Sequence, residues 1–290
     1  MRSSVAELKK APQPLKHVWD HENVRCTAVC VAPNDVDWSL KDLYTPESGD
    51  SPFAREVADS LYEHGVRGTV FGPTVTDMNA HLTDADKLTT EILLPHGITL
   101  YRNPGLKADG LPLSADAGET FVMSGGGCPI IVAIGDGEVI AAHASRDSMI
   151  DRTRVMTGSQ SRQHESVLHA IVREFKDWDI SPSQVHVHVY FSVPAAAFTH
   201  DFSDAAYGAF NRALHRDLRK RGLGDDVMQK ATGAFSIPAL CAGLGRQLGL
   251  GKVEKSCMLP QHGRFGYTRN PIDSLKKARN LEFVTVERIH

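Results

Sequence analysis

The chain has 290 residues, of which 41% are hydrophobic and 23% are charged, a composition typical of a globular protein with a sizeable core. A formal net charge of −3 argues against nucleic acid or an anionic membrane as the main partner. No apolar stretch has the length of a membrane span, no signal peptide is visible, and an odd number of cysteines, five, does not suggest a disulfide framework. We therefore expect a cytoplasmic protein, with secretion as an effector as the alternative.

The N-terminal half predicts an arm followed by alternating elements. Residues 1–22 are polar and interrupted by prolines, which predicts a flexible N-terminal arm, and residues 23–290 are expected to form a single domain. A helix is predicted over 51–64, where it ends at Gly65. Short strands are predicted at 67–72 and 97–102.

The C-terminal half continues this alternation. Helices are predicted over 161–175, over 203–222 with Ser203 as N-cap, and over 236–249, and strands over 184–193 and 281–289. In the first of these strands, His186 and His188 are expected on a solvated face. Because helices and strands are interspersed, we expect a single α/β domain with a mixed sheet or sandwich flanked by helices.

A hairpin is the most informative local prediction. Residues 123–145 read MSGGGCPIIVAIGDGEVIAAHAS, in which a Gly-Asp-Gly turn joins two apolar strands. A loop centred on Gly135-Asp136 places Cys128 opposite His143, and a loop centred on Asp136-Gly137 places them diagonally on the same face. Both two-residue registers predict that thiol and imidazole converge.

The chemistry of this pair has two interpretations. His143 deprotonates the Cys128 thiol, or the two side chains share a metal ion. The preceding Gly125, Gly126 and Gly127 carry no side chains, so a ligand or another part of the backbone can approach closely, and their amides can bind an anion. His96, which stands before a glycine at the start of a strand, is a candidate third metal ligand.

These segments resemble the YfiH or laccase-domain family, which includes zinc-dependent purine nucleoside enzymes. The resemblance rests on the order of LPHG (94–97), SADAGET (114–120), GGGCPIIVA (125–133), AAHAS (141–145), PALCAGLGRQLGLGKVEKSC (238–257) and the arginine-bearing RFGYTRNPIDSLKKAR (264–279). It implies a zinc ion on His96, Cys128 and His143, with Arg146 and Arg269 as substrate-binding residues. Gly127 stands where the family has an aspartate used for proton transfer.

A second resemblance concerns the same cysteine. MSGGGC (123–128), His143 and the Thr-Gly at 157–158 are similar to the catalytic arrangement of cytotoxic necrotizing factor-type glutamine deamidases. That resemblance implies a metal-independent reaction in which Cys128 is the nucleophile, His143 its base and a protein glutamine the substrate.

Three functional hypotheses follow. The first is a zinc-dependent enzyme acting on a purine nucleoside or a similar small molecule through His96, Cys128 and His143. The second is a Cys-His deamidase acting on another protein, with the glycine-run amides as oxyanion donors. The third is a catalytically inactive binding relative, suggested by the missing aspartate.

Overall fold

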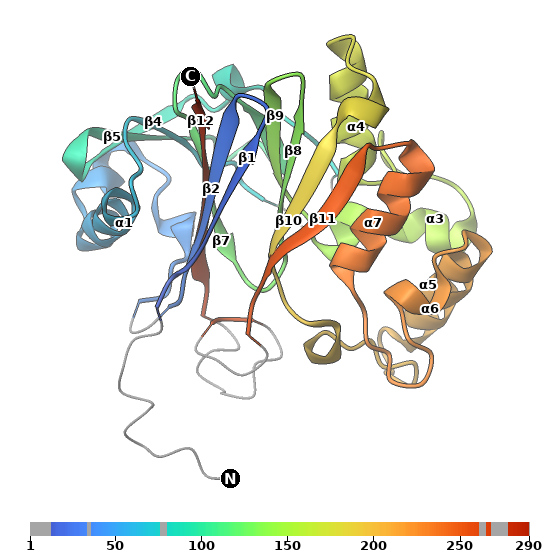
Figure 1. The fold of residues 1–290 in the computed structure, drawn as a ribbon. Helices are drawn as coiled ribbons and strands as arrows, with labels where there is room; N and C mark the ends of the chain where they lie inside the picture. Colours follow the sequence, from blue (N-terminus) through green and yellow to red (C-terminus); the bar gives the residue numbers. More distant parts are fainter. Residues whose placement is uncertain (1–12, 34–35, 76–79, 261–264, 268–277, 290) are drawn as a thin grey trace.

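The chain folds into two β-sheets packed face to face between two layers of helices (Figure 1). The computed structural model describes residues 13–33, 36–75, 80–260, 265–267 and 278–289. Apolar side chains from both sheets, such as Phe121, Val284, Val132 and Tyr190, are buried between them. The inner faces of the two sheets thus form the central core.

The first sheet has seven described strands in the order β1-β2-β12-β7-β3-β5-β4. Their bounds are β1 (Leu15–His21), β2 (Val24–Val31), β3 (Thr69–Phe71), β4 (Thr90–Leu94), β5 (Ile98–Arg102), β7 (Thr120–Gly125) and β12 (Asn280–Arg288). β3 pairs in parallel with both β5 and β7. The carboxyl ends of these three strands therefore lie at one edge of the sheet.

The second sheet has five described strands in the order β11-β10-β8-β9-β6. Their bounds are β6 (Gly110–Leu113), β8 (Ile130–Gly135), β9 (Glu138–His143), β10 (His186–Ser192) and β11 (Lys252–Met258). β10 and β11 are parallel, and the other neighbours are antiparallel. The β7–β8 connection, which contains the glycine run and Cys128, crosses from the first sheet to the second.

Helices cover the outer faces of both sheets. α1 (Pro52–Glu63) packs on the first sheet, and α4 (Val167–Asp177), α5 (Gly208–Lys220) and α7 (Ile237–Leu248) pack on the second (Figure 1). The short helices are α2 (Arg146–Met149), α3 (Arg152–Thr157) and α6 (Gly224–Val227). Within the described residues, no helix has both the length and the apolar character needed to cross a membrane.

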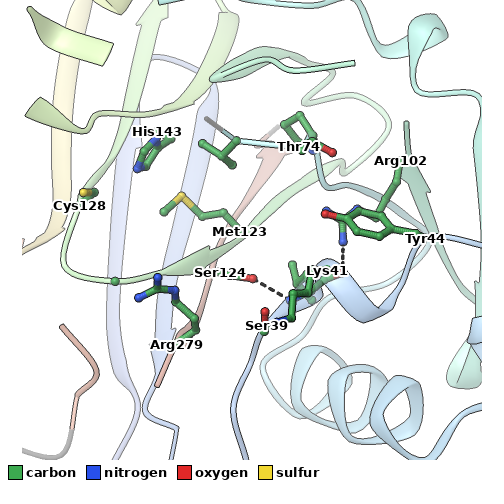
Figure 2. A pocket seen from close by; sticks show the side chains of 14 residues that line it. Ser39, Lys41, Tyr44, Thr74, Arg102, Met123, Ser124, Cys128, His143 and Arg279 are labelled. Carbon is green, nitrogen blue, oxygen red and sulfur yellow. Dashed lines mark hydrogen bonds between the residues drawn. The ribbon is translucent and has the colours of Figure 1, made fainter. Parts of the chain in front are cut away.

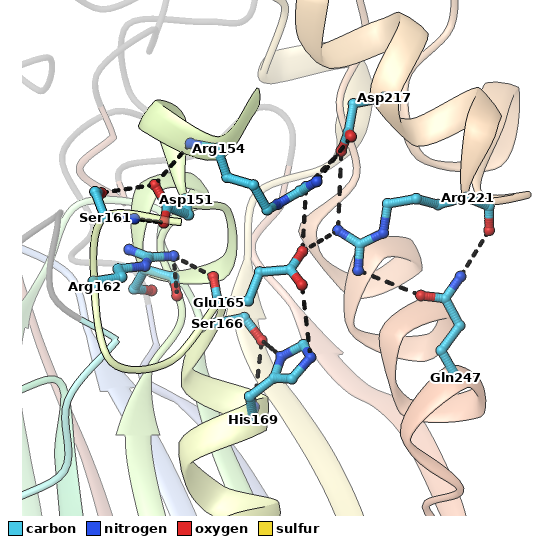
Figure 3. A network of polar contacts seen from close by, with 11 residues as sticks. Asp151, Arg154, Ser161, Arg162, Glu165, Ser166, His169, Asp217, Arg221 and Gln247 are labelled. Atoms are coloured by element: carbon cyan, nitrogen blue, oxygen red, sulfur yellow. Dashed lines mark hydrogen bonds and ion pairs between the residues drawn. The ribbon is translucent and has the colours of Figure 1, made fainter. Parts of the chain in front are cut away.

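A partly buried polar network joins the helices on the second sheet (Figure 3). The Arg154 guanidinium of α3 donates two hydrogen bonds, of 3.0 and 2.7 Å, to the Asp217 carboxylate of α5. Glu165, just before α4, pairs with Arg154 and with Arg221. Gln247 of α7 donates to the backbone carbonyl oxygen of Arg221 at 2.7 Å. None of these residues lines the cavity described below, so the network stabilises the helical layer.

The predicted helices and strands are found, with two helix starts predicted too early. The helix predicted over 161–175 begins at Val167, after the N-cap Ser166. The helix predicted from Ser203 begins at Gly208 instead. The Ser203 hydroxyl donates to Asp201 Oδ1 at 2.6 Å, and the Asp204 carboxylate accepts hydrogen bonds from the amides of residues 206 and 207. Side-chain hydrogen bonds thus form a turn where the sequence predicts the first helical turn.

The structure also corrects the expected flexible arm over part of residues 1–22. Residues 15–21 form β1, which pairs with β2 along its whole length. Alternate residues of β1 face the second sheet, where Trp19 stacks on His188 at an interplanar angle of 28°. His188 is 4% exposed, so the expected solvated face is wrong at this position. After Leu15, the inward face of β1 consists of His17, Trp19 and His21, so the strand lacks the aliphatic alternation that marks a core strand.

Candidate active site

The β8–β9 hairpin brings Cys128 and His143 together. Its two-residue loop is Asp136-Gly137, one of the two predicted registers, with φ values of 50° and 77° that fit a type I′ turn. Ile130 pairs with His143 across the hairpin, and Cys128 lies two residues before Ile130. Because strand side chains alternate between faces, Cys128 and His143 point to the same side.

Both side chains line a cavity of about 380 Å³ at the edge where β3, β5 and β7 end. Figure 2 shows Cys128 and His143 together on one side of the cavity, with Tyr44 and Arg102 on the opposite side. Arg102 is the last residue of β5, and Ser124 lies near the end of β7. The site thus occupies the position where ligands bind in many α/β proteins, outside the carboxyl ends of parallel strands.

Asp109 lies behind His143 and forms the third member of the site. Its Oδ1 is 3.5 Å from Nδ1 of His143, and its side chain is fully buried. The backbone orients the pair, because the His143 amide donates to the Asp109 carbonyl oxygen at 2.7 Å. The Asp109 Oδ2 accepts a hydrogen bond from the His81 amide at 3.3 Å. Asp109 stands immediately before β6, so the pairing of β6 with β9 places it beside His143.

The surroundings favour a protonated His143. Burial opposes a charge on the imidazole, but interactions with Asp109 and Cys128 outweigh it and raise the pKa of His143 to about 10. At neutral pH the ring is therefore an imidazolium. An imidazolium beside a cysteine stabilises the thiolate, which is the nucleophilic form of the side chain.

The space beside the glycine run is filled mainly by other side chains of the protein. A Cβ on Gly125 would lie 1.8 Å from Glu282 Oε1, and one on Gly126 would lie 2.7 Å from Arg279 Nη1. Gly127 has a φ of 94°, which disfavours any side chain. Gly126 lines the cavity beside Cys128, whereas Gly125 and Gly127 do not line it. The close approach predicted for this run is therefore made largely by Glu282 and Arg279.

His96 lies far from the other two proposed zinc ligands. It stands between β4 and β5, where its Nε2 is 2.6 Å from Asp59 Oδ1 and its ring stacks on Tyr62. Val70 of β3 pairs with both Leu100 of β5 and Thr120 of β7, so these two residues lie at the same level of the sheet. β5 begins two residues before this level and β7 ends five residues after it, which separates the start of β5 from the end of β7 by seven residues along the strand direction. At about 3.3 Å per residue this is roughly 23 Å. The structure therefore brings together Cys128 and His143 without His96.

The donor set does not fit a zinc ion. No group of three or more His, Cys, Asp or Glu side chains suited to a metal occurs in the described parts of the chain. His143 directs Nδ1 at Asp109, as in histidines oriented by a carboxylate. Catalytic zinc sites use three protein ligands, and Cys128 and His143 supply two.

Of the two predicted substrate-binding arginines, one is described by the structure and lies away from the cysteine–histidine–aspartate site. Arg146 Nε donates to Asp147 Oδ1 at 2.8 Å, its guanidinium lies over the Phe210 ring, and it does not line the cavity. Arg269 lies outside the described residues. The cavity is instead lined by Lys41, Arg102 and Arg279, none of which was predicted as a site residue.

Asp109 was missed because its signal is ambiguous. Two Ala-Asp pairs stand seven residues apart, at 108–109 and 115–116, and the resemblance pointed to the second. Asp116 lies in a turn, where its Oδ1 is 2.8 Å from Nε of Arg288. The sequence does show that Asp109 directly precedes a short apolar strand. It does not show that this strand pairs with β9, and that pairing is what brings Asp109 to His143.

Fold and site together define a two-sheet α/β protein with a cysteine–histidine–aspartate site at a cavity. No protein-family model matches the sequence, and no curated protein matches it. A Neisseria meningitidis protein of family DUF152 has a similar structure, with a TM-score of 0.60 and 14% identity over 96% of this chain and 99% of that one. YfiH of Bacillus licheniformis is similar with a TM-score of 0.51 and 15% identity, covering 90% of this chain and 92% of that one.

YlmD of Geobacillus stearothermophilus matches with a TM-score of 0.52 and 14% identity, over 91% of this chain and 92% of that one. The chain thus has the fold of these DUF152, YfiH and YlmD proteins. The predicted fold class and the predicted resemblance to YfiH are confirmed at the level of structure.

Proposed function

We propose that the protein is a metal-independent thiol enzyme that hydrolyses a carboxamide. Cys128 is the nucleophile, His143 the proton donor and acceptor, and Asp109 the residue that orients and charges His143. The observation that carries this proposal is the placement of the His143 ring beside the Cys128 thiol, with Asp109 3.5 Å from its Nδ1, at the wall of a cavity. Cysteine, histidine and an orienting third group form a general arrangement for nucleophilic catalysis.

The reaction proceeds in two balanced steps. The Cys128 thiolate attacks the amide carbonyl carbon, the C–N bond breaks, and His143 gives its proton to the departing nitrogen, which leaves as ammonia. The resulting thioester is attacked by water, and His143 accepts a proton from that water. The C–S bond then breaks to release a carboxylic acid and restore the thiolate–imidazolium pair, and the acid passes its proton to the released ammonia, giving carboxylate and ammonium.

The backbone near Cys128 supports stabilisation of the intermediate. Within the described residues, the amide groups of Gly126, Gly127 and Cys128 are not used as hydrogen-bond donors. Unused N–H groups beside a nucleophile are suited to bind the oxyanion that forms during attack on a carbonyl. We therefore retain the predicted role of oxyanion donor for the amides of Gly126 and Gly127.

A zinc-dependent enzyme acting on a purine nucleoside is the alternative, and it predicts different behaviour of Cys128. A metal-bound thiolate is protected from alkylation until a chelator is added. The separation of His96 from Cys128 and His143 disfavours the ligand set that this alternative requires. An inactive binding protein, the third possibility, predicts a thiol without enhanced reactivity.

Alkylation with iodoacetamide at pH 7, followed by peptide mass analysis, tests the proposal. Cys257 is an internal reference, because it is half-buried like Cys128 and burial raises its pKa. We expect Cys128 to react at least about tenfold faster than Cys257 without a chelator, because a thiolate reacts and a thiol does not. His143→Asn should remove this difference, and the matched control His96→Ala should preserve it.

Two results would contradict the proposal. Stoichiometric zinc that is lost in His96→Ala, with Cys128 reacting after chelation, would establish the metal alternative. Equal reactivity of Cys128 and Cys257 in metal-free protein would favour the binding protein. Release of ammonia from a panel of small carboxamides, abolished by Cys128→Ala, measures the reaction itself.

A further inference from the structure

The cavity beside Cys128 is positively charged in a protein of negative net charge. Three of its lining residues, Lys41, Arg102 and Arg279, are cationic, and none of the described residues that line it is an aspartate or glutamate. The chain as a whole carries a formal charge of −3. The three cations come from three separate segments: the 3-10 turn Leu40–Asp42, the end of β5 and the residue before β12. The fold thus concentrates positive charge at this position.

Arg102 is held in place by groups that leave its charge unbalanced. It is 4% exposed, and its Nη1 donates to the backbone carbonyl oxygens of Leu40 and, at 3.3 Å, of Leu43. Its guanidinium lies over the Tyr44 ring, and no described carboxylate pairs with it. The buried Nε has no hydrogen-bond partner within the described residues. A buried, unpaired cation is costly unless a ligand of opposite charge completes the site.

Among the described residues, the other two cations also lack a carboxylate partner. Neither Lys41 nor the Arg279 side chain forms an ion pair within the part of the chain that the structure describes. Arg279 lies against Gly126, next to the cysteine, and its backbone is fixed by a 2.9 Å hydrogen bond from its amide to Asp37 Oδ1. In Figure 2, Arg279 is on the same side of the cavity as Cys128, and Lys41 and Arg102 are on the other. Cations thus stand both on the sulfur's side of the cavity and across the cavity from it.

We propose that the substrate is a small molecule carrying a carboxylate or phosphate group that binds Arg102, Lys41 and Arg279, while its reactive carbon lies at the Cys128 sulfur. This inference rests on the proposed function in taking Cys128 as the reacting group. The cavity volume of about 380 Å³ lies in the range typical of small-ligand sites. Charge recognition therefore supplies the specificity, and the thiol supplies the chemistry.

A pair of alkylating probes separates the two proposals. Iodoacetate and iodoacetamide both transfer their CH₂ carbon to the thiolate sulfur and release iodide, but iodoacetate also carries a carboxylate. We expect the ratio of iodoacetate to iodoacetamide rates at Cys128 to exceed that of a free cysteine by about tenfold, because one charge contact at intermediate dielectric has about this effect. The iodoacetamide rate alone tests the thiol.

Substitutions then locate the anion site. In the double variant K41Q/R279Q the ratio of iodoacetate to iodoacetamide rates should fall to that of a free cysteine, and R102Q should lower it likewise if it folds, because the ratio cancels any change in thiol reactivity that affects both probes. Lys16→Gln, at an exposed position of β1, is the control that changes net charge without touching the cavity. Succinate and inorganic phosphate, tested separately as protecting ligands, distinguish a carboxylate from a phosphate. A wild-type rate ratio equal to that of free cysteine, or one unchanged in K41Q/R279Q, would overturn the inference while leaving the thiol enzyme intact.

Discussion

At the scale of single residues, Asp109 controls the protonation of His143. The carboxylate is fully buried, 3.5 Å from His143 Nδ1, and its interaction is one of two that raise the pKa of His143 to about 10 against the effect of burial. Ordinary histidines have a pKa near 6.5. Asp109 is thus a positioning residue that also keeps the imidazole charged.

Asp109→Asn should therefore raise the pH that Cys128 needs to react with iodoacetamide. Asparagine keeps the size of the side chain and removes its charge, so the pKa of His143 falls, the imidazolium that stabilises the thiolate is lost at lower pH, and the thiolate forms only at higher pH. The rate of iodoacetamide reaction, measured from pH 5 to 11 in wild type and variant, should show this shift. The matched control is Asp116→Asn, which removes a carboxylate at the surface pair with Arg288. Identical pH profiles for wild type and Asp109→Asn would disprove the role of Asp109.

At the scale of elements, β1 is a structural strand at the edge of the first sheet. Its inward side chains lie over the second sheet, where Trp19 stacks on His188 and His21 packs against His186. Its outward residues are exposed, including Val18 at 48%. The strand thus links the two sheets through aromatic contacts with β10, which pairs with β8 of the hairpin.

Trp19→Ala should destabilise the protein by about 2 kcal/mol, because it removes a half-buried aromatic ring from the contact between the sheets. Val18→Ala is the matched control on the same strand and should change the free energy of unfolding by about 0.5 kcal/mol or less. Urea denaturation followed by circular dichroism measures both. Equal effects of the two substitutions would mean that β1 contributes little to the packing of the sheets.

At the scale of the whole molecule, a buried acid makes stability depend on pH. Glu282 of β12 is fully buried, and this burial raises its pKa to about 8, although Asn280 donates a hydrogen bond to it at 3.2 Å. Between its unfolded pKa near 4.5 and the folded value, the native state holds a proton that the unfolded state has released. Stability from this group is therefore complete below pH 4.5 and is lost as the pH rises to about 8.

Glu282→Gln should remove this dependence, because glutamine resembles the protonated acid and does not titrate. The free energy of unfolding of wild type, minus that of the variant, should decrease by about 1.4 kcal/mol per pH unit between the two pKa values. His188 has the opposite sign, since burial lowers its pKa to about 4 and its stabilisation is lost as pH falls below 6.5. Subtracting the variant from the wild type cancels the His188 contribution. A difference that stays constant from pH 5 to 8 would show that Glu282 is ionised in the folded protein.

The sequence by itself determined the elements and the convergence of Cys128 with His143. A Gly-Asp-Gly turn and the alternation of strand residues act over sixteen positions of the chain, so both predicted two-residue registers placed thiol and imidazole on one face. The α/β class followed from the order of helices and strands, and the order of short motifs pointed to the YfiH fold.

The tertiary structure decided which further residues belong to the site. Asp109, Lys41, Arg102 and Arg279 come from four segments whose proximity depends on the strand order of the two sheets, and no local pattern encodes that order. The same order puts His96, before β5, at the opposite end of the sheet from Cys128, after β7. Strand pairing between residues far apart in the chain thus assembled an aspartate and three cations around Cys128 and His143, because the parallel strands β3, β5 and β7 all end at this edge.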